Sequence, residues 1–119
     1  MPAPTHHAIS YVELGVTDLP STRTFYEQAF GWRFHDYGPA YSGITAPDGE
    51  GEVGGLNPGA APSAAGPLVL LFSEDLDGTV SAVEEAGGAV VARPYEFPGG
   101  RRFEFTDPSG NRLGVFADS

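Results

Sequence analysis

The chain begins with an alternating hydrophobic pattern and then changes to a helical one. Residues 9–16 alternate hydrophobic side chains with polar or small ones, which predicts a strand with two different faces. In residues 18–31 the hydrophobic positions recur at helical spacing, with Asp18 suited to cap the N-terminus and Gly31 suited to end the helix in a left-handed conformation. Three short strand-like segments follow, at residues 32–38, 41–47 and 52–56. This order predicts a βαβββ unit.

The same order returns after a stretch rich in Pro, Gly, Ala and Ser at residues 57–67, which has the composition of a linker. When Asp18 is placed on Asp75, six of the fourteen positions 18–31 are identical in the second copy. Each copy also ends with a Thr-x-Pro-x-Gly turn and a strand, at residues 45–56 and 106–116. We therefore predict an α+β fold of two tandem βαβββ modules, at about 8–57 and about 68–117, joined by a linker at about 58–67. Together they form a single domain over residues 1–119.

Three segments resemble a known superfamily. They are YVELGVTDLPSTRTFYEQAFGW, DLDGTVSAVEEAGGAVV and FTDPSGNRLGVF. They are similar to the vicinal oxygen chelate superfamily, which contains glyoxalases, bleomycin resistance proteins and extradiol dioxygenases. The resemblance implies that the two modules curve into an open-barrel sheet with the site on its concave side, and that the protein is a homodimer.

The better-known enzymes of this superfamily bind a divalent metal through His and Glu side chains of the concave strands. The resemblance places the four ligand positions at Tyr11, Leu68, Gly114 and either Val53 or Gly55. A divalent metal needs three or four nitrogen or oxygen donors, which these residues do not supply. The histidines of the chain are His6, His7 and His35, and adjacent residues such as the first two point to opposite sides of a strand. We therefore expect no family-type metal and no cofactor.

Strand alternation predicts which side chains face the concavity. If Tyr11 faces it, Glu13 does so as well, whereas Val12 and Leu14 pack on the helix side. The predicted ligand-binding residues are Tyr11, Tyr41, Leu68, Leu70, Phe72, Arg102, Glu104, Gly114 and Phe116. Glu13 is the candidate catalytic base, since a desolvated carboxylate can accept a proton. Alternatively, the tyrosines are core residues, and Arg102 forms a structural ion pair with Glu13 or Glu104.

The charge of the chain limits its partners. Sixteen acidic residues face six arginines and no lysine, so the formal net charge is −10. This balance argues against a nucleic-acid partner, which needs clustered cations. It suits a cationic ligand, or it serves only to keep the protein soluble.

Without cysteine the chain has no disulfide and no thiolate chemistry. The first residues lack the features of a signal peptide and no segment could span a bilayer, so we expect a cytoplasmic protein without a membrane partner.

These observations favour a metal-independent protein that binds a small organic molecule, cationic or aromatic, in the concave cavity. The alternative is an enzyme of the same fold, a lyase, isomerase or epimerase. It would use Glu13 or Glu104 as base and Tyr11 as proton donor, or a divalent metal at a non-standard site. A third interpretation is a dimerising scaffold without a ligand.

Overall fold

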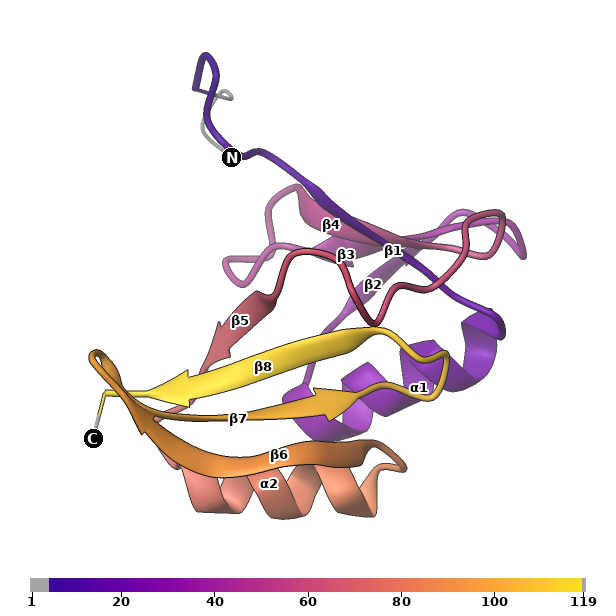
Figure 1. Ribbon diagram of the computed structural model, residues 1–119. Helices are drawn as coiled ribbons and strands as arrows, with labels where there is room; N and C mark the ends of the chain where they lie inside the picture. The colour runs from indigo at the N-terminus through magenta and orange to yellow at the C-terminus, as the bar shows by residue number, and fades with distance from the viewer. Residues whose placement is uncertain (1–4, 119) are drawn as a thin grey trace.

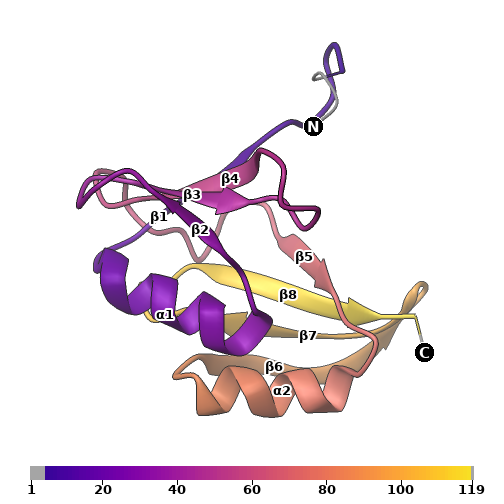
Figure 2. The same cartoon turned by 180° about the vertical axis from the view of Figure 1, so that it is seen from behind.

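The computed structural model describes residues 5–118 and contains two βαβββ modules (Figures 1 and 2). Module one comprises β1 (Val12–Gly15), α1 (Leu19–Phe30), β2 (Phe34–Asp36), β3 (Ser42–Thr45) and β4 (Glu52–Asn57). Module two comprises β5 (Val69–Phe72), α2 (Leu76–Glu85), β6 (Ala89–Phe97), β7 (Gly100–Thr106) and β8 (Arg112–Ala117). Each module has a four-stranded mixed sheet, ordered β1-β4-β3-β2 in the first and β5-β8-β7-β6 in the second. The predicted α+β fold with two modules is confirmed.

The helix ends follow the capping residues of the sequence. Asp18 caps α1 with its side chain, and Gly31 ends this helix with a φ of 70°. Asp75 caps α2 in the same way. The glycine with positive φ that follows α2 is Gly87, with a φ of 100°, one residue before the Gly88 that the repeat aligns with Gly31. The second helix ends at Glu85, two residues before the position that the repeat aligns with the end of α1.

Helix α1 packs against both modules, and this contact joins them. Phe25 and Tyr26 of α1 belong to one buried cluster with Phe105 of β7, and α2 contributes to the same cluster. Leu19, at the start of α1, packs with Leu56 of β4 in a second cluster. Figures 1 and 2 show α1 beneath the first sheet and beside the second, with α2 below the second sheet. The helix-facing sides of both sheets thus converge on one core, and the opposite sides face outward.

The turn of module two attaches directly to module one. Asp107 is buried, and its carboxylate accepts a hydrogen bond of 2.8 Å from the Tyr26 hydroxyl of α1. The side-chain amide of Asn111 donates to the backbone carbonyl of Gly15 at 2.7 Å. Position 107 corresponds to Ala46 in the first copy of the turn, so only the second copy carries this buried acid. The repeated turn therefore has a second role in module two, as the contact between the modules.

The Tyr26–Asp107 pair makes stability depend on alkaline pH. Burial raises the pKa of the Tyr26 hydroxyl, and the Asp107 carboxylate raises it further. Because the folded chain holds this proton more tightly, the unfolded chain loses it first, and stability falls as the pH rises above about 10. In Tyr26→Phe we expect a slope of unfolding free energy against pH that is shallower by up to about 1.4 kcal/mol per pH unit. Urea unfolding from pH 9.5 to 11.5 tests this; equal slopes in both proteins would contradict it.

The predicted linker forms neither helix nor strand, but it is held in place. The backbone N–H of Ser63 donates to the Asn111 side chain at 3.0 Å, and the Ser63 carbonyl accepts from the N–H of Arg112. The Ala61 carbonyl lies so close to Gly15 that a Cβ there would come within 2.2 Å of it. Glycine is therefore required at position 15, where the linker crosses β1. Within residues 5–118, no helix has the length and apolar character needed to cross a membrane.

Candidate ligand site

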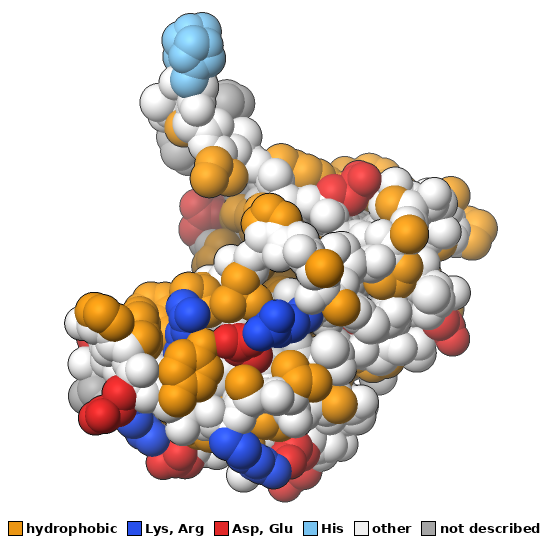
Figure 3. All heavy atoms as spheres, in the orientation of Figure 1, with side chains coloured by type: hydrophobic (Ala, Val, Ile, Leu, Met, Phe, Trp, Pro, Cys, Tyr) orange, Lys and Arg blue, Asp and Glu red, His pale blue; other side chains and the backbone are white. Residues whose placement is uncertain are grey.

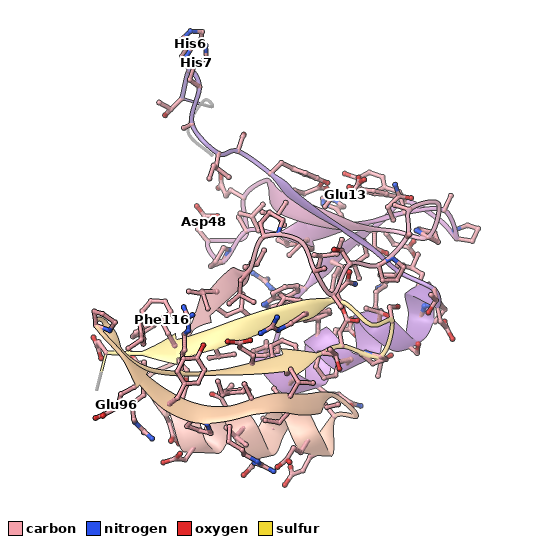
Figure 4. The ribbon with its side chains drawn as sticks, in the orientation of Figure 1. His6, His7, Glu13, Asp48, Glu96 and Phe116 are labelled. Atoms are coloured by element: carbon pink, nitrogen blue, oxygen red, sulfur yellow. The ribbon has the colours of Figure 1, made fainter. Side chains whose placement is uncertain are left out.

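The predicted site residues of module one meet on the outward side of the first sheet. The Tyr11 and Tyr41 hydroxyls lie 2.7 Å apart, and the Tyr41 hydroxyl donates to Glu13 at 3.0 Å. The Asn57 amide donates to the other oxygen of Glu13 at 3.1 Å. Figure 4 shows Glu13 on the side of β1 away from α1. Alternation along β1 therefore positions this acid and its tyrosine partners together.

A second carboxylate, Glu52 of β4, completes this surface. It accepts hydrogen bonds from Tyr37 at 2.5 Å and from Tyr11 at 3.5 Å, and His35 Nδ1 lies 3.6 Å from it. We name Tyr11, Glu13, Tyr37, Tyr41 and Glu52 the module-one face.

The sequence did not identify Glu52, because simple alternation from Gly55 places it on the core side. The pairing shifts between Ile44 and Thr45: Ile44 pairs with Gly54, whereas Thr45 pairs with Glu52. This irregularity leaves Val53 unpaired and turns Glu52 outward. A one-residue bulge of this kind has no clear signal in the sequence.

Two glycines let the polar side chains lie flat across the sheet. A Cβ on Gly55 would come within 1.9 Å of the Tyr41 hydroxyl oxygen. A Cβ on Gly43 would come within 2.4 Å of a carboxylate oxygen of Glu52. Any larger residue at either position would displace these groups. The glycines therefore shape a shallow polar surface on the first sheet.

Tyr37 and Tyr41 of this face act as hydrogen-bond donors. Partial burial raises the pKa of the Tyr41 hydroxyl, and its hydrogen bonds with Tyr11 and Glu13 raise it further. The hydrogen bond to Glu52 raises the pKa of Tyr37. Both hydroxyls thus stay protonated at neutral pH and donate to carboxylates without neutralising their charge.

The predicted polar residues of module two form a second group, on the outward side of the second sheet. Arg112 and Tyr95 both hydrogen-bond to Glu104, which is only 5% exposed. The Arg102 Nε donates to the Tyr95 hydroxyl at 2.5 Å, and its guanidinium lies over the rings of Tyr95 and Phe97 at 5.3 and 5.2 Å from their centroids. Arg102 is thus fixed by aromatic rings, with Glu104 beside it.

Tyr95 and Phe97 are not in the predicted set, because they follow Pro94, which lacks the N–H of a regular strand residue. In the structure β6 continues through Pro94 to Phe97, with register shifts along the way. It is an edge strand of its sheet, where a residue without an N–H is tolerated.

Hydrophobic side chains surround these charged groups. Phe116 contacts the rings of Phe72 and Phe97, with centroids 5.3 and 6.3 Å apart. Phe72 is 54% exposed and Leu70 is 37% exposed, while Gly114 leaves room for Leu70. The module-two face comprises Leu70, Phe72, Tyr95, Phe97, Arg102, Glu104, Arg112 and Phe116. Figure 3 shows basic and acidic side chains among hydrophobic ones around β7 and β8, and Figure 4 shows Phe116 in front of β8.

The two faces meet at a pocket of about 550 Å³ between β1 and the start of module two. Tyr11 and Glu13 line it on one side, and Leu68 and Arg112 line it on the other. This seam pocket brings together three of the predicted residues. The rest of the predicted set lies outside it: Tyr41 on the module-one face, and Leu70, Phe72, Arg102, Glu104, Gly114 and Phe116 on the second sheet.

The donor set does not fit the divalent metal that the resemblance implies. Leu68, Gly114, Val53 and Gly55 have no donor atom in their side chains, and the Tyr11 hydroxyl bonds to Tyr41. His6 and His7 stack on each other in the N-terminal segment, away from both sheets (Figure 4). Between residues 5 and 118, no three His, Asp or Glu side chains are grouped closely enough to hold a metal ion. We therefore derive no metal-dependent step.

Comparisons with known proteins agree with this fold. Residues 8–115 match the family model of the Glyoxalase/Bleomycin resistance protein/Dioxygenase superfamily. The chain is 30% identical over 117 residues to the putative glyoxylase CFP32 of Mycobacterium bovis, and 32% identical over 113 residues to the anthracycline biosynthesis protein DnrV of Streptomyces peucetius. These alignments cover 90% and 91% of this chain but 44% and 40% of the relatives. The chain thus spans less than half the length of these curated relatives.

Solved structures show the same architecture. A glyoxalase/bleomycin resistance protein/dioxygenase family enzyme from Burkholderia phytofirmans superposes with a TM-score of 0.77 at 20% identity, covering 93% of this chain and 98% of the other. TnmS3, an antibiotic binding protein from Streptomyces sp. CB03234, superposes with a TM-score of 0.71 at 26% identity, covering 100% of both chains. The chain therefore belongs to the glyoxalase/bleomycin resistance protein/dioxygenase superfamily.

Proposed function

We propose that this chain binds a small organic cation with an aromatic body, without a metal, at a site that two copies of the chain share. The observation that carries the proposal is the module-one face. There, Glu13 and Glu52 are held among tyrosine hydroxyls on an outward surface that Gly43 and Gly55 keep open.

The charge of this face favours a cation. Tyr41 and Tyr37 donate hydrogen bonds to the two carboxylates, but neutral hydroxyls leave the negative charges in place. His35, beside Glu52, is charged only when protonated. An ammonium group placed here would meet carboxylates and the faces of tyrosine rings, both of which attract cations. The surface therefore suits a positively charged ligand better than a neutral one.

Relatives support the same class of ligand. TnmS3 is described as an antibiotic binding protein, and DnrV as an anthracycline biosynthesis protein. A flat aromatic body would find stacking partners on the module-two face, where Phe72 and Phe116 are in contact.

A homodimer would bring the two faces together. Within one chain the two faces point away from the core and meet only at the seam pocket, so a ligand covered by the rest of both faces needs the module-two face of a second copy. The faces have complementary charges, since Glu13 and Glu52 lie on one and Arg102 and Arg112 on the other. Exposed side chains such as Phe72 and Tyr37 would also be covered. Association about a twofold axis forms two such sites.

The binding test compares 9-aminoacridine, a planar aromatic cation, with acridine, which has the same ring system and is neutral at pH 8. We expect the protein to prefer the cation. In Glu52→Gln the affinity for 9-aminoacridine is expected to fall about tenfold, because one charge-assisted contact is lost, whereas that for acridine stays unchanged. Isothermal titration calorimetry measures both affinities.

Three controls accompany this titration. Glu96→Gln removes an exposed acid of β6 and is expected to leave both affinities unchanged (Figure 4). Treatment with EDTA is expected to leave binding unchanged, and a loss of binding would contradict metal independence. Sedimentation velocity of the same samples should give the mass of two chains. Equal binding of both probes, or an equal loss in Glu96→Gln, would contradict the cation site.

An enzyme that uses acid–base catalysis is the second candidate, favoured by the hydrogen-bonded series from Tyr11 through Tyr41 to Glu13. Such a series can pass a proton between a bound molecule and a carboxylate. Glu13→Gln separates the candidates. In an enzyme this substitution abolishes turnover while the substrate still binds, and in a binding protein it weakens binding alone.

A further inference from the structure

A second cavity lies on the opposite side of the sheets from both faces described above. Its volume is about 560 Å³, within the usual range of small-molecule sites. Val12 and Leu14 of β1 line it on one side, and Val69 and Leu71 of β5 on the other. These residues alternate with the outward-facing Glu13 and Leu70, so the cavity lies on the core side of the sheets. Val12, Leu14 and Val69 also line the seam pocket, so the two cavities are neighbours, but Trp32, Arg33 and Leu71 line only the core-side cavity.

The end of α1 forms the third wall of the core-side cavity. Trp32 and Arg33 line it just after the helix-ending glycine. The indole of Trp32 stacks on the buried Tyr26, with ring centroids 4.3 Å apart and planes 9° apart, so this wall is fixed by the core. The cavity is therefore an apolar space with a rigid aromatic wall and one cationic side chain.

Arg33 differs from the other five arginines in its side-chain partners. Within residues 5–118 each of the other five has a partner: Arg23 with Glu27 and Asp36, Arg93 with Glu84, Arg101 with Asp77, Arg102 with Tyr95, and Arg112 with Glu104. The Arg33 guanidinium forms no ion pair or side-chain hydrogen bond with any residue of that range; it lies beside the turn glycine Gly49. In a chain with sixteen acidic residues and six arginines, carboxylates greatly outnumber their cationic partners. An arginine left without a carboxylate is therefore available for an external anion.

We propose that the core-side cavity binds a lipophilic carboxylate, with its hydrocarbon part among Leu14, Val69 and Leu71 and its carboxylate on Arg33. Burial of the hydrocarbon supplies the apolar part of the affinity. A guanidinium binds a carboxylate with two parallel hydrogen bonds, which selects an acid over an alcohol of equal length. The net charge of −10 repels anions from most of the surface, so selection of an acid depends on this one arginine.

The test uses decanoate and decanol, both below the concentrations at which they aggregate. Trp32 is the only tryptophan of the chain and lines the cavity, so its fluorescence reports binding. We expect decanoate to bind more tightly than decanol. In Arg33→Gln, decanoate is expected to bind about tenfold more weakly while decanol is unaffected, because only the charged contact is lost. Leu71→Phe narrows the cavity and is expected to weaken both, with urea unfolding to verify that this variant is folded.

Two control variants test whether decanoate binding depends on Arg33 in particular. Arg93→Gln removes an exposed arginine elsewhere and is expected to bind decanoate as the parent protein does. Glu52→Gln, which tests the cation site, is also expected to leave decanoate binding unchanged, so failure of one proposal does not imply failure of the other. The proposal is overturned if neither probe changes the Trp32 fluorescence, if the parent protein binds both equally, or if Arg33→Gln binds decanoate as the parent protein does.

Discussion

Replacing Asp107 with alanine is expected to destabilise the folded chain by about 3–5 kcal/mol, because it leaves several buried donors without an acceptor. The carboxylate, 4% exposed, accepts the backbone N–H groups of Ser109, Gly110 and Asn111. It also accepts the Tyr26 hydroxyl at 2.8 Å and the Asn111 side-chain amide at 3.0 Å. The N–H of Gly110 and the Asn111 amide keep the backbone carbonyls of Asp107 and Gly15 as acceptors. The N–H groups of Ser109 and Asn111 and the Tyr26 hydroxyl lose the acceptor described here. The loss therefore affects both the turn and its attachment to α1.

Asp48→Ala is the matched control, since Asp48 lies in the equivalent turn of module one. It is exposed and accepts the N–H of Glu50 at 2.9 Å, so its removal is expected to cost less than about 1 kcal/mol. Urea unfolding of the three proteins, with midpoints and slopes compared, measures both effects. If the two alanine variants lost similar stability, the Asp107 carboxylate would have no special role in joining the modules.

The fold was predictable because its signals are local. Asp18, Gly31 and Asp75 act on residues within a few positions of themselves, and the repeat places the same order of elements twice. The contact of Asp107 with Tyr26 could not be predicted, because the residues are 81 positions apart and only the packing of α1 brings them together. Local patterns thus identified the turn but not its partner.

Local patterns also predicted only part of the candidate site. Alternation placed Tyr11 and Glu13 on one side of the strand and the repeat added Tyr41 to the same predicted surface; in the structure Tyr41 hydrogen-bonds to both. Glu52 was missed because a bulge reverses its direction, and Tyr95 because an edge strand continues past a proline. The sequence also grouped the residues of both modules in one concavity. Because α1 packs between the modules, the structure places them on two outward faces that meet at the seam pocket.

Replacing Phe25 with alanine is the second change with a large expected effect, a loss of about 3–5 kcal/mol. This side chain is 1% exposed, and its ring lies 5.9 Å from that of Phe105 in module two. It also packs against Gly88, where a Cβ would come within 2.7 Å of the ring. Removing the ring leaves a cavity between α1 of module one and both β7 and the loop between α2 and β6 of module two. The variant should still unfold in one transition, because both modules lose the same contact.

Phe72→Ala tests whether burial, rather than aromatic character, determines this loss. Phe72 is 54% exposed on the module-two face, so its removal is expected to cost less than about 1 kcal/mol. Urea unfolding followed by Trp32 fluorescence and by far-ultraviolet circular dichroism gives both the free energy and the number of transitions. Trp32 lies in module one, whereas circular dichroism reports both modules, so the two signals coincide only if the modules unfold together.

If α1 stabilised module one alone, Phe25→Ala would shift the fluorescence transition to lower urea and leave part of the dichroism transition unchanged. Separate transitions would therefore contradict the shared core, and with it the outward orientation of both faces on which the proposed dimer depends.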